Sequence, residues 1–485
     1  MKLNRREFLL LTGAGFLSRP LCSFAQTKRR VLILGAGLSG LSAAYELSAK
    51  GFDVIIVEAR NRIGGRVVTL REPFRDDQTV ELGGELVGDG YKRFLNYAKK
   101  FGIEFEELRG ATETGGSVTN LNKGIGTSAI LKGKLYPVGS NLDANPYNLS
   151  GDEARELPPT VLIRNIVAMA SETRAAPSKL FEFDRISLAE ASRRRGVSKE
   201  MIRLMNISLN YNSIETVSAG SVLWESRRRV GAGTKAIKIK GGNDLIPRAL
   251  FENAVKAGVK FILEARVKTI YDDERQARVS FENKRGKVET IETDVIVCTI
   301  PFSVLRDVVF SPTLPEAKAK AIRELAYTRI TKVFLQATRA EWDKRNLGSS
   351  VWTDTPCERI FNADGKPGDS LGIFTIWTDG DGARLPESLS DKNRLAWGKK
   401  EFARALPFMK NAVETGATKS WTNDEFARGA YSHFSTGQLE ELQPNLKTSV
   451  GNVHFAGEHT AEFAPGMEGA LESAERAVNE IANRQ

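Results

Sequence analysis

The sequence is poor in cysteine and histidine. Only three of its 485 residues are histidine, and three are cysteine: Cys22, Cys298 and Cys357. Three cysteines exclude a disulfide-rich scaffold and a cysteine-rich metal site. The histidines are not spaced as zinc ligands on a helix, and so few of them leave little for a serine–histidine triad. We therefore expect no metal ion and a reaction that does not depend on histidine.

Long apolar runs are also missing. After the first 25 residues, no segment approaches the ~18 apolar residues of a membrane span, so we expect no integral membrane segment. The net charge is +10, but the basic residues are scattered, and the densest clusters are the arginines at 193–195 and 227–229. No aromatic residues are interleaved with them, so we expect a solvated basic surface and no nucleic-acid partner. The remaining composition is that of a globular chain of two or three domains.

The first 25 residues have the pattern of an export signal. Arg5 and Arg6 precede an apolar run that extends to Phe16, and Ser23-Phe24-Ala25 has the small-x-small form of a cleavage site. The arginine pair resembles a twin-arginine signal, although an ordinary secretory signal could also contain two arginines. Twin-arginine export is typical of bacterial proteins that fold around a cofactor before crossing the membrane. The sequence therefore predicts a periplasmic protein that has lost residues 1–25.

A strand–turn–helix–strand unit follows at residues 31–58. The glycines of its turn have the Gly-x-Gly-x-x-Gly spacing and are Gly35, Gly37 and Gly40. In this pattern they permit a tight turn, close approach of the backbone to a pyrophosphate, and close packing of helix on strand. Glu58 ends the second strand and is placed to accept hydrogen bonds from a ribose. The unit predicts a dinucleotide cofactor whose phosphate lies at the helix N-terminus.

The residues after this unit indicate which dinucleotide is bound. They read Glu58-Ala59-Arg60-Asn61-Arg62-Ile63-Gly64-Gly65-Arg66. Here the chain resembles the flavin-containing amine oxidase family, which includes monoamine, polyamine and L-amino-acid oxidases. Three further motifs carry the same resemblance, so that it covers nearly the whole chain after the signal: Glu81-Leu82-Gly83-Gly84, Gly457-Glu458-His459-Thr460 and Gly466-Met467-Glu468-Gly469-Ala470-Leu471.

The resemblance implies a bound FAD. Val267 matches the position whose backbone meets the adenine in relatives. Ala430 stands where monoamine oxidases carry a flavin-linking cysteine, so we expect the FAD to be non-covalent. The residues implied to bind the cofactor are Gly35, Gly37, Gly40, Glu58, Ala59, Arg60, Gly65, Arg66, Gly83, Gly84, Val267, Gly457, Glu458 and Met467.

The implied fold is α/β, with a Rossmann-like FAD-binding domain interleaved with an α+β substrate-binding domain. We expect residues 28–88, 236–302 and 416–485 to form the first domain, and residues 89–235 and 303–415 to form the second. Residues 260–270 read as one alternating stretch, and residues 110–126 as a loop. Residues 152–206 are predicted to be helical, 332–336 and 372–377 to be strands lining a pocket, and 466–482 to be a helix.

Four residues are candidates for chemistry. Lys332 matches the lysine that relatives hold near flavin N5 through a water, where a cation favours anionic reduced flavin and the approach of superoxide. Tyr431 matches one of the two aromatics that sandwich the amine in monoamine oxidases. Trp421 belongs to the same region. It could line the substrate pocket or serve only in structural packing, and the sequence does not favour either role. Glu85 follows the glycine pair, where L-amino-acid oxidases carry a carboxylate-binding arginine. It is suited to binding a cationic substrate, or it is a structural acid.

The expected reaction is FAD-dependent oxidation of a primary or secondary amine to an imine, which yields an aldehyde, ammonia and hydrogen peroxide. One alternative is an L-amino-acid oxidase or dehydrogenase, for instance for basic amino acids, that passes electrons to oxygen or a quinone. An arginine reaching the pocket, such as Arg329 or Arg359, would support it. Another alternative is a non-catalytic flavoprotein partner of a periplasmic protein. A homodimer is a further expectation.

Overall fold

The computed structural model describes residues 28–107, 127–138, 140, 146–207, 209–364 and 369–483. The predicted export signal at residues 1–25 and the predicted loop at residues 110–126 lie outside these residues. Within the described ranges, no helix is both long enough and apolar enough to cross a membrane.

A parallel five-stranded sheet forms one half of the molecule, in the order β10-β2-β1-β14-β23. Alternate residues of β1 point into two different cores. Val31 and Ile33 pack with helices, whereas Leu32 and Leu34 pack with a second sheet. Burial on both faces explains why these strands read as unbroken apolar runs. The strands are β1 (Arg30–Leu34), β2 (Asp53–Val57), β10 (Lys260–Ile262), β14 (Val295–Cys298) and β23 (Val453–Phe455).

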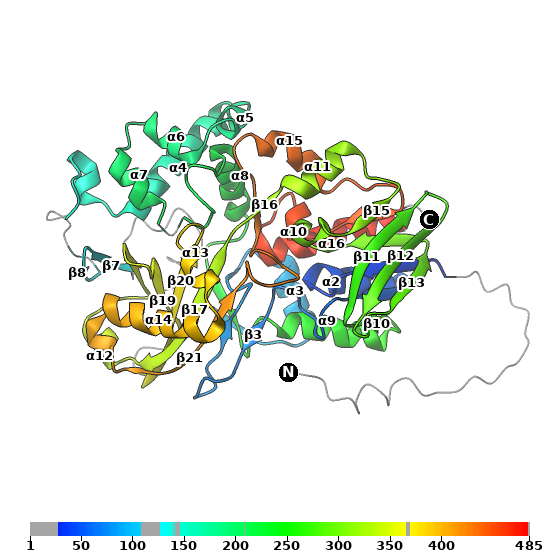
Figure 1. The fold of residues 1–485 in the computed structure, drawn as a ribbon, viewed down its shortest axis with the longest axis horizontal. Coiled ribbons are helices and arrows are strands. Elements are labelled where there is room, and N and C mark those ends of the chain that lie inside the picture. The colour runs from blue at the N-terminus through cyan, green and yellow to red at the C-terminus, as the bar shows by residue number, and fades with distance from the viewer. Residues whose placement is uncertain are drawn as a thin grey trace, which may run out of the picture.

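The helices on one face come from distant parts of the chain, and Figure 1 shows α2, in blue, and α16, in red, on the same side of the molecule. The predicted C-terminal helix at residues 466–482 is confirmed as α16. Close packing of α2 on α16 therefore joins the first and last segments of the described chain. These helices are α2 (Leu38–Ala49), α3 (Lys92–Lys100), α9 (Leu245–Lys256) and α16 (Gly466–Ala482).

A four-stranded sheet covers the other face, in the order β13-β12-β11-β15. The stretch at residues 260–270, which we expected to be continuous, divides between this sheet and the parallel one. Glu264 has a φ of +57° and turns the chain, after which the Ala265 N–H donates to the Glu58 carbonyl at 2.9 Å. The four strands are β11 (Ala265–Asp272), β12 (Ala277–Asn283), β13 (Val288–Thr293) and β15 (Val309–Ser311).

The other half is built on a seven-stranded sheet in the order β21-β17-β20-β19-β18-β7-β8. The strands predicted at 332–336 and 372–377 are confirmed within β17 and β20. On β17, Val333 and Leu335 pack in a core with Phe402 of α14 (Asp391–Ala405), so Lys332 points to the opposite face. The strands are β7 (Thr127–Leu131), β8 (Lys134–Tyr136), β17 (Ile330–Thr338), β18 (Ser350–Thr353), β19 (Arg359–Asp364), β20 (Leu371–Asp379) and β21 (Val413–Ser420).

A group of helices lies beside this sheet and above it in Figure 1. It contains the segment predicted to be helical at residues 152–206, which is confirmed. Its elements are a 3-10 turn (Gly151–Arg155), α4 (Pro158–Ala175), α5 (Lys179–Asp184), α6 (Leu188–Arg193), α7 (Lys199–Met205) and α8 (Ala219–Val230). The fold is thus α/β with a Rossmann-like parallel sheet, as expected.

Shorter elements connect these parts. The strands are β3 (Thr69–Leu70), β4 (Val80–Glu81), β5 (Val87–Gly88), β6 (Phe105–Glu107), β9 (Ala236–Ile239), β16 (Ala326–Tyr327) and β22 (Ser432–His433). The helices are α10 (Phe302–Leu305), α11 (Glu316–Glu324), α12 (Ala340–Lys344), α13 (Arg384–Ser388), η4 (Pro407–Met409), α15 (Gln438–Leu446) and η5 (Glu458–Thr460).

Lys318 on α11 is buried without an ion-pair partner in the described part of the chain. Its Nζ donates to the Leu446 carbonyl at 3.0 Å and lies 4.1 Å from the ring centre of Phe455. Burial, assisted by the nearby charge of Arg476, lowers the pKa of Lys318 to about 7. Between pH 7 and the ordinary pKa of 10.5, the unfolded chain therefore binds more protons than the folded chain, and stability rises with pH.

Lys318→Met is therefore expected to raise the free energy of unfolding at pH 7 by about 1–4 kcal/mol. Because the neutral amine is tolerated better at high pH, the advantage of the variant should shrink between pH 7 and pH 10. Urea unfolding across this range measures both effects. Lys320→Met on the same helix, which removes a solvent-screened pair with Glu441, serves as the control and should leave stability nearly unchanged. A Lys318→Met protein that is less stable than wild type at pH 7 would contradict this account.

Candidate active site and cofactor cradle

The three glycines of the first turn have different surroundings. Gly35 has a φ of +107°, and a Cβ on it would lie 2.7 Å from the Thr299 hydroxyl oxygen. A Cβ on Gly40 would overlap the Gly35 carbonyl oxygen. Gly37 is extended, with φ −74° and ψ 178°, and its Cβ would meet nothing closer than the Gly65 Cα at 4.0 Å. Gly35 and Gly40 are therefore required for packing. Gly37 instead borders space in which a ligand could approach the protein backbone.

Glu58 places a carboxylate beside this turn. Its two oxygens accept N–H groups from Ala36 at 2.7 Å and Arg60 at 2.8 Å, and the residue is 7% exposed. Burial raises the pKa of Glu58, and the two backbone hydrogen bonds oppose that rise. The Arg60 guanidinium does not point to the turn but pairs with Asp424. A carboxylate at the end of the second strand is where dinucleotide folds bind a ribose.

Arg66 joins two motifs that are 392 residues apart in sequence. It donates to the Ala430 carbonyl at 2.6 Å and to the Glu458 carboxylate at 3.3 Å. Glu458 also accepts the Ser432 N–H at 3.2 Å and the Ser432 hydroxyl at 2.9 Å. The predicted motifs at residues 58–66 and 457–460 therefore meet at this point.

The glycine pair at 83–84 is packed on both sides. A Cβ on Gly83 would overlap the Arg66 carbonyl oxygen, and a Cβ on Gly84 would lie 2.8 Å from the Met467 sulfur. Trp421 is 2% exposed and donates its indole N–H to the Leu82 carbonyl at 2.7 Å. These contacts give Trp421 a packing role against the glycine segment. Substrate binding by Trp421 stays a prediction.

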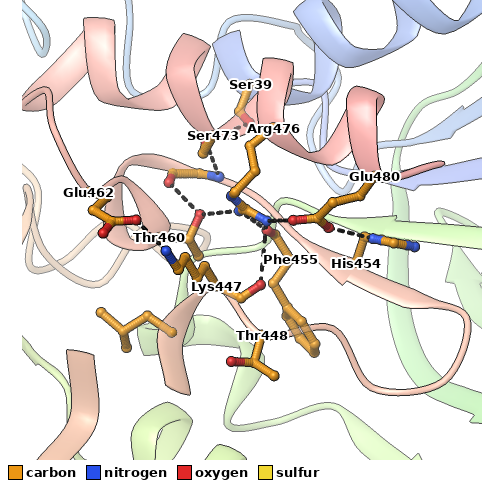
Figure 2. A network of polar contacts seen from close by, with 12 residues as sticks. Ser39, Lys447, Thr448, His454, Phe455, Thr460, Glu462, Ser473, Arg476 and Glu480 are labelled. Carbon is orange, nitrogen blue, oxygen red and sulfur yellow. Dashed lines mark hydrogen bonds and ion pairs between the residues drawn. The ribbon is translucent and has the colours of Figure 1, made fainter. Parts of the chain in front are cut away.

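The C-terminal wall of the site is held by the polar network in Figure 2. Ser473 accepts the Gly457 N–H at 2.8 Å, and Arg476 donates to the Phe455 carbonyl at 2.6 Å. The Glu480 carboxylate contacts both the Arg476 guanidinium, at 2.8 Å, and the His454 Nδ1, at 2.7 Å. Since Ser473, Arg476 and Glu480 all lie on α16, this helix fixes the turn that carries Glu458.

The N-terminus of α16 also faces this region. The helix begins at Gly466 after Pro465, and among the described residues no side chain caps this end. Helix N-termini carry partial positive charge and favour electron-rich or anionic groups. Met467 in the first turn contacts Gly84, so the uncapped end lies next to the glycine pair.

Lys332 lies beside the same glycine pair and is 1% exposed. Its Nζ donates to the Glu81 carbonyl at 3.1 Å and the Gly83 carbonyl at 3.5 Å, and lies 4.3 Å from the ring centre of Trp377. It also forms an ion pair with Glu85 at 2.8 Å. This pair gives Glu85 a partner within the protein, whereas substrate binding by Glu85 stays a prediction.

A row of side chains crosses the seven-stranded sheet from Lys332. Strand register places Lys332 opposite Trp377, and Trp377 opposite Arg359. Arg359 bonds the Asp379 carboxylate and the Asn210 side chain, each at 2.7 Å, and burial raises the pKa of Asp379. Of the two arginines that sequence reasoning named, Arg359 thus shares the row with Lys332, whereas Arg329 is paired with Glu387 on α13.

Tyr431 stands near the far end of this row. It is half-buried, and its hydroxyl donates to the Asn210 carbonyl at 2.9 Å. Burial and Asp379 raise the pKa of Tyr431, while Arg229 and Arg359 oppose the rise. Asp379, Trp377 and Arg229 were not among the predicted site residues. The sequence predicts a solvated surface for the cluster at 227–229, and Arg229 is 36% exposed and paired with Glu225 at 3.0 Å.

These residues fit an extended dinucleotide. The open backbone at Gly37 could take a pyrophosphate, Glu58 could take the ribose, and the uncapped end of α16 could face the ring system. Val267 lies on β11, which begins beside Glu58, and so is placed at the nucleotide end. The model of the flavin-containing amine oxidoreductase family matches residues 38–482. The chain belongs to this family.

Similar proteins agree with this assignment. The chain is 26% identical over 469 residues to an L-amino-acid oxidase of Sistrurus catenatus edwardsii, covering 93% of this chain and 87% of that protein. It is 28% identical over 471 residues to an L-amino-acid oxidase of Siganus canaliculatus, covering 95% and 86%. Its fold matches cyclohexylamine oxidase from Brevibacterium oxydans with a TM-score of 0.75 at 20% identity, over 94% of this chain and 99% of that one. This flavin-containing amine oxidoreductase is therefore an oxidoreductase that acts on amines with a flavin.

Proposed function

We propose that this amine oxidoreductase binds FAD non-covalently and deaminates a primary or secondary amine. The dinucleotide turn and the Glu58 carboxylate support FAD, and alanine at position 430 supports non-covalent binding. Held by this turn and Glu58, the flavin would supply the acceptor for a hydride from the carbon that bears the amine. The imine is then hydrolysed to a carbonyl product and ammonia or a smaller amine.

The observation that carries this proposal is the buried Lys332 at the glycine pair. Three acceptors hold its ammonium group, two carbonyls of residues 81–83 and the Glu85 carboxylate, in a position shielded from water. A fixed cation there stabilises negative charge that develops close by and costs no reorganisation during the reaction. This supports oxygen as the electron acceptor and hydrogen peroxide as the product.

The residues around Tyr431 support a neutral amine as the reacting form. An aromatic face orients the substrate, and removal of the amine from water disfavours its protonated form. Loss of the ammonium proton leaves the nitrogen lone pair free to assist hydride departure.

Localisation is part of the same proposal. Arg5 and Arg6 ahead of an apolar run support twin-arginine export to the periplasm. The cofactor cradle is built from both ends of the chain, which suits an export route that carries folded proteins.

The test is anaerobic addition of amines and amino acids to the purified yellow protein. Bleaching of the flavin absorbance by a substrate, followed by recovery and peroxide formation in air, is expected. If the bleached flavin recovers its absorbance with a quinone but not in air, the protein is a dehydrogenase and not an oxidase. A protein that binds FAD but is bleached by no amine or amino acid would contradict the proposal and favour a non-catalytic flavoprotein partner.

A further inference from the structure

The segment of chain that surrounds Lys332 has little regular structure of its own. It connects β4, which ends at Glu81, with β5, which begins at Val87. It supplies all three acceptors of the Lys332 ammonium group: the carbonyls of Glu81 and Gly83, at 3.1 and 3.5 Å, and the Glu85 carboxylate, at 2.8 Å. Because a lysine side chain is long and flexible, the position of its charge depends on where these acceptors are held.

Asn243 holds the end of this segment. Its side-chain nitrogen donates to the Gly84 carbonyl at 3.0 Å and to the Glu85 carbonyl at 2.9 Å. Asn243 is only 3% exposed, so water competes little for these contacts. Among the described residues, the Glu85 backbone has no other hydrogen bond. The place of Glu85 therefore depends on one side chain from a distant part of the sequence.

The turn that carries Asn243 is itself fixed to β4. The Asn243 N–H donates to the Glu81 carboxylate at 2.8 Å, and this carboxylate also accepts the Thr69 hydroxyl at 3.0 Å. Gly242 has a φ of +109°, and a Cβ there would lie 2.3 Å from the Thr69 side chain. Such close packing leaves the turn little freedom to move. Asn243 thus contacts the segment at both ends from a rigid base.

The middle of the segment has supports that do not involve Asn243. The Gly84 N–H donates to the Arg66 carbonyl at 3.0 Å, and the Leu82 carbonyl accepts an indole N–H at 2.7 Å. Loss of the Asn243 side chain should therefore leave the glycine pair in place and release Glu85.

We infer that Asn243 is a positioning residue for Lys332: it holds Glu85 in place, and the Glu85 carboxylate in turn holds the ammonium group at the glycine pair. The inference rests on the proposed part of Lys332 in the reaction with oxygen and adds a residue to it. A fixed cation stabilises developing charge better than a mobile one, because a mobile cation must reorganise during the reaction. Displacement of a reacting group by about 1 Å can cost about 100-fold in rate.

The test is Asn243→Ala in the FAD-loaded protein. Stopped-flow mixing of the reduced variant with oxygenated buffer should show reoxidation about 10-fold slower than in the wild type, whereas anaerobic reduction by substrate should change less than about 2-fold. Asn243→Ser keeps one donor and should fall between the two proteins. Asn253→Ala is the matched control, because the Asn253 side chain donates to the Ala249 carbonyl on α9 at 2.8 Å. It should leave both rates unchanged.

A double variant shows whether Asn243 acts through Lys332. In the Lys332→Met background no ammonium group is left to position, so adding Asn243→Ala should change the rate of reoxidation by less than about 2-fold. An equal loss in both backgrounds would overturn the inference, and so would reoxidation of Asn243→Ala at the wild-type rate. Reoxidation of Lys332→Met at the wild-type rate would instead refute the proposed role of Lys332, and the inference would fall with it.

Chemical labelling gives a readout that does not depend on activity. Limiting acetic anhydride, followed by peptide mass spectrometry, measures how fast Lys332 is acetylated relative to exposed lysines. Release of Glu85 should raise the rate at Lys332 at least about 5-fold in Asn243→Ala, and Asn253→Ala should match the wild type. An unchanged rate at Lys332 would overturn the inference. Should Asn243→Ala fail to retain FAD, Asn243→Ser serves for the same comparisons, with smaller changes in the same directions.

Discussion

Lys332→Met is expected to slow the reaction of the reduced enzyme with oxygen by about 100-fold or more. The substitution removes the buried cation beside the glycine pair and keeps a side chain of similar length. Anaerobic reduction by substrate should change less, because hydride transfer does not need that cation. Stopped-flow mixing of the reduced protein with oxygenated buffer measures the rate of reoxidation. Anaerobic mixing of the oxidised protein with substrate measures the rate of reduction.

The control for this experiment must account for Glu85, which loses its partner at 2.8 Å in the single variant. An unpaired carboxylate next to the site would act by its own negative charge and by destabilising the fold. The double variant Lys332→Met/Glu85→Gln removes both charges and restores neutrality. If Lys332 acts on oxygen, the double variant should also react slowly. If the single variant is reoxidised at the wild-type rate, Lys332 has no role in the reaction with oxygen.

Gly37→Val is expected to yield a folded protein that does not retain FAD. Gly37 has extended backbone angles that valine adopts readily. Among the described residues other than its chain neighbours, the nearest atom to its Cβ position is the Gly65 Cα, at 4.0 Å. The added side chain would fill the space assigned to the pyrophosphate. We expect the Kd for FAD to rise at least about 100-fold, because direct backbone contact with the phosphates would be lost.

Circular dichroism and the flavin released on denaturation measure fold and cofactor separately. Gly40→Val is the contrasting variant, since any Cβ there overlaps the Gly35 carbonyl, and it should impair folding itself. Gly37→Ala should lie between wild type and Gly37→Val in FAD affinity. A Gly37→Val protein that keeps its full complement of FAD would contradict the assignment of the cradle.

The sequence predicted those parts of the fold that have a strong local signal. Strand β1, the glycine turn after it and the helix at 466–482 were each predicted from a pattern within about 20 residues. The division of residues 260–270 into two strands was missed, because it depends on a positive φ at Glu264, which is not a glycine. No local pattern reports such a turn.

The site was predicted less completely than the fold. Motifs at residues 58–66, 83–84 and 457–460 were found because each is continuous. The Lys332–Glu85 pair joins residues 247 apart and leaves no local trace. Arg227, Arg228 and Arg229 look alike in sequence, but successive residues on a helix point about 100° apart. They therefore have three different sets of contacts, with Thr173, Ala464 and Glu225, and tertiary packing decides which residue makes which contact.

The split origin of the proposed cofactor cradle sets an order of events during synthesis. The turn after β1 leaves the ribosome early, but the Glu458 carboxylate that holds Arg66, and the helix that supports it, belong to the end of the chain. A nascent polypeptide thus presents a phosphate loop without its opposite wall. Tight capture of the cofactor must wait until translation is complete, and clipping of the tail would release it again.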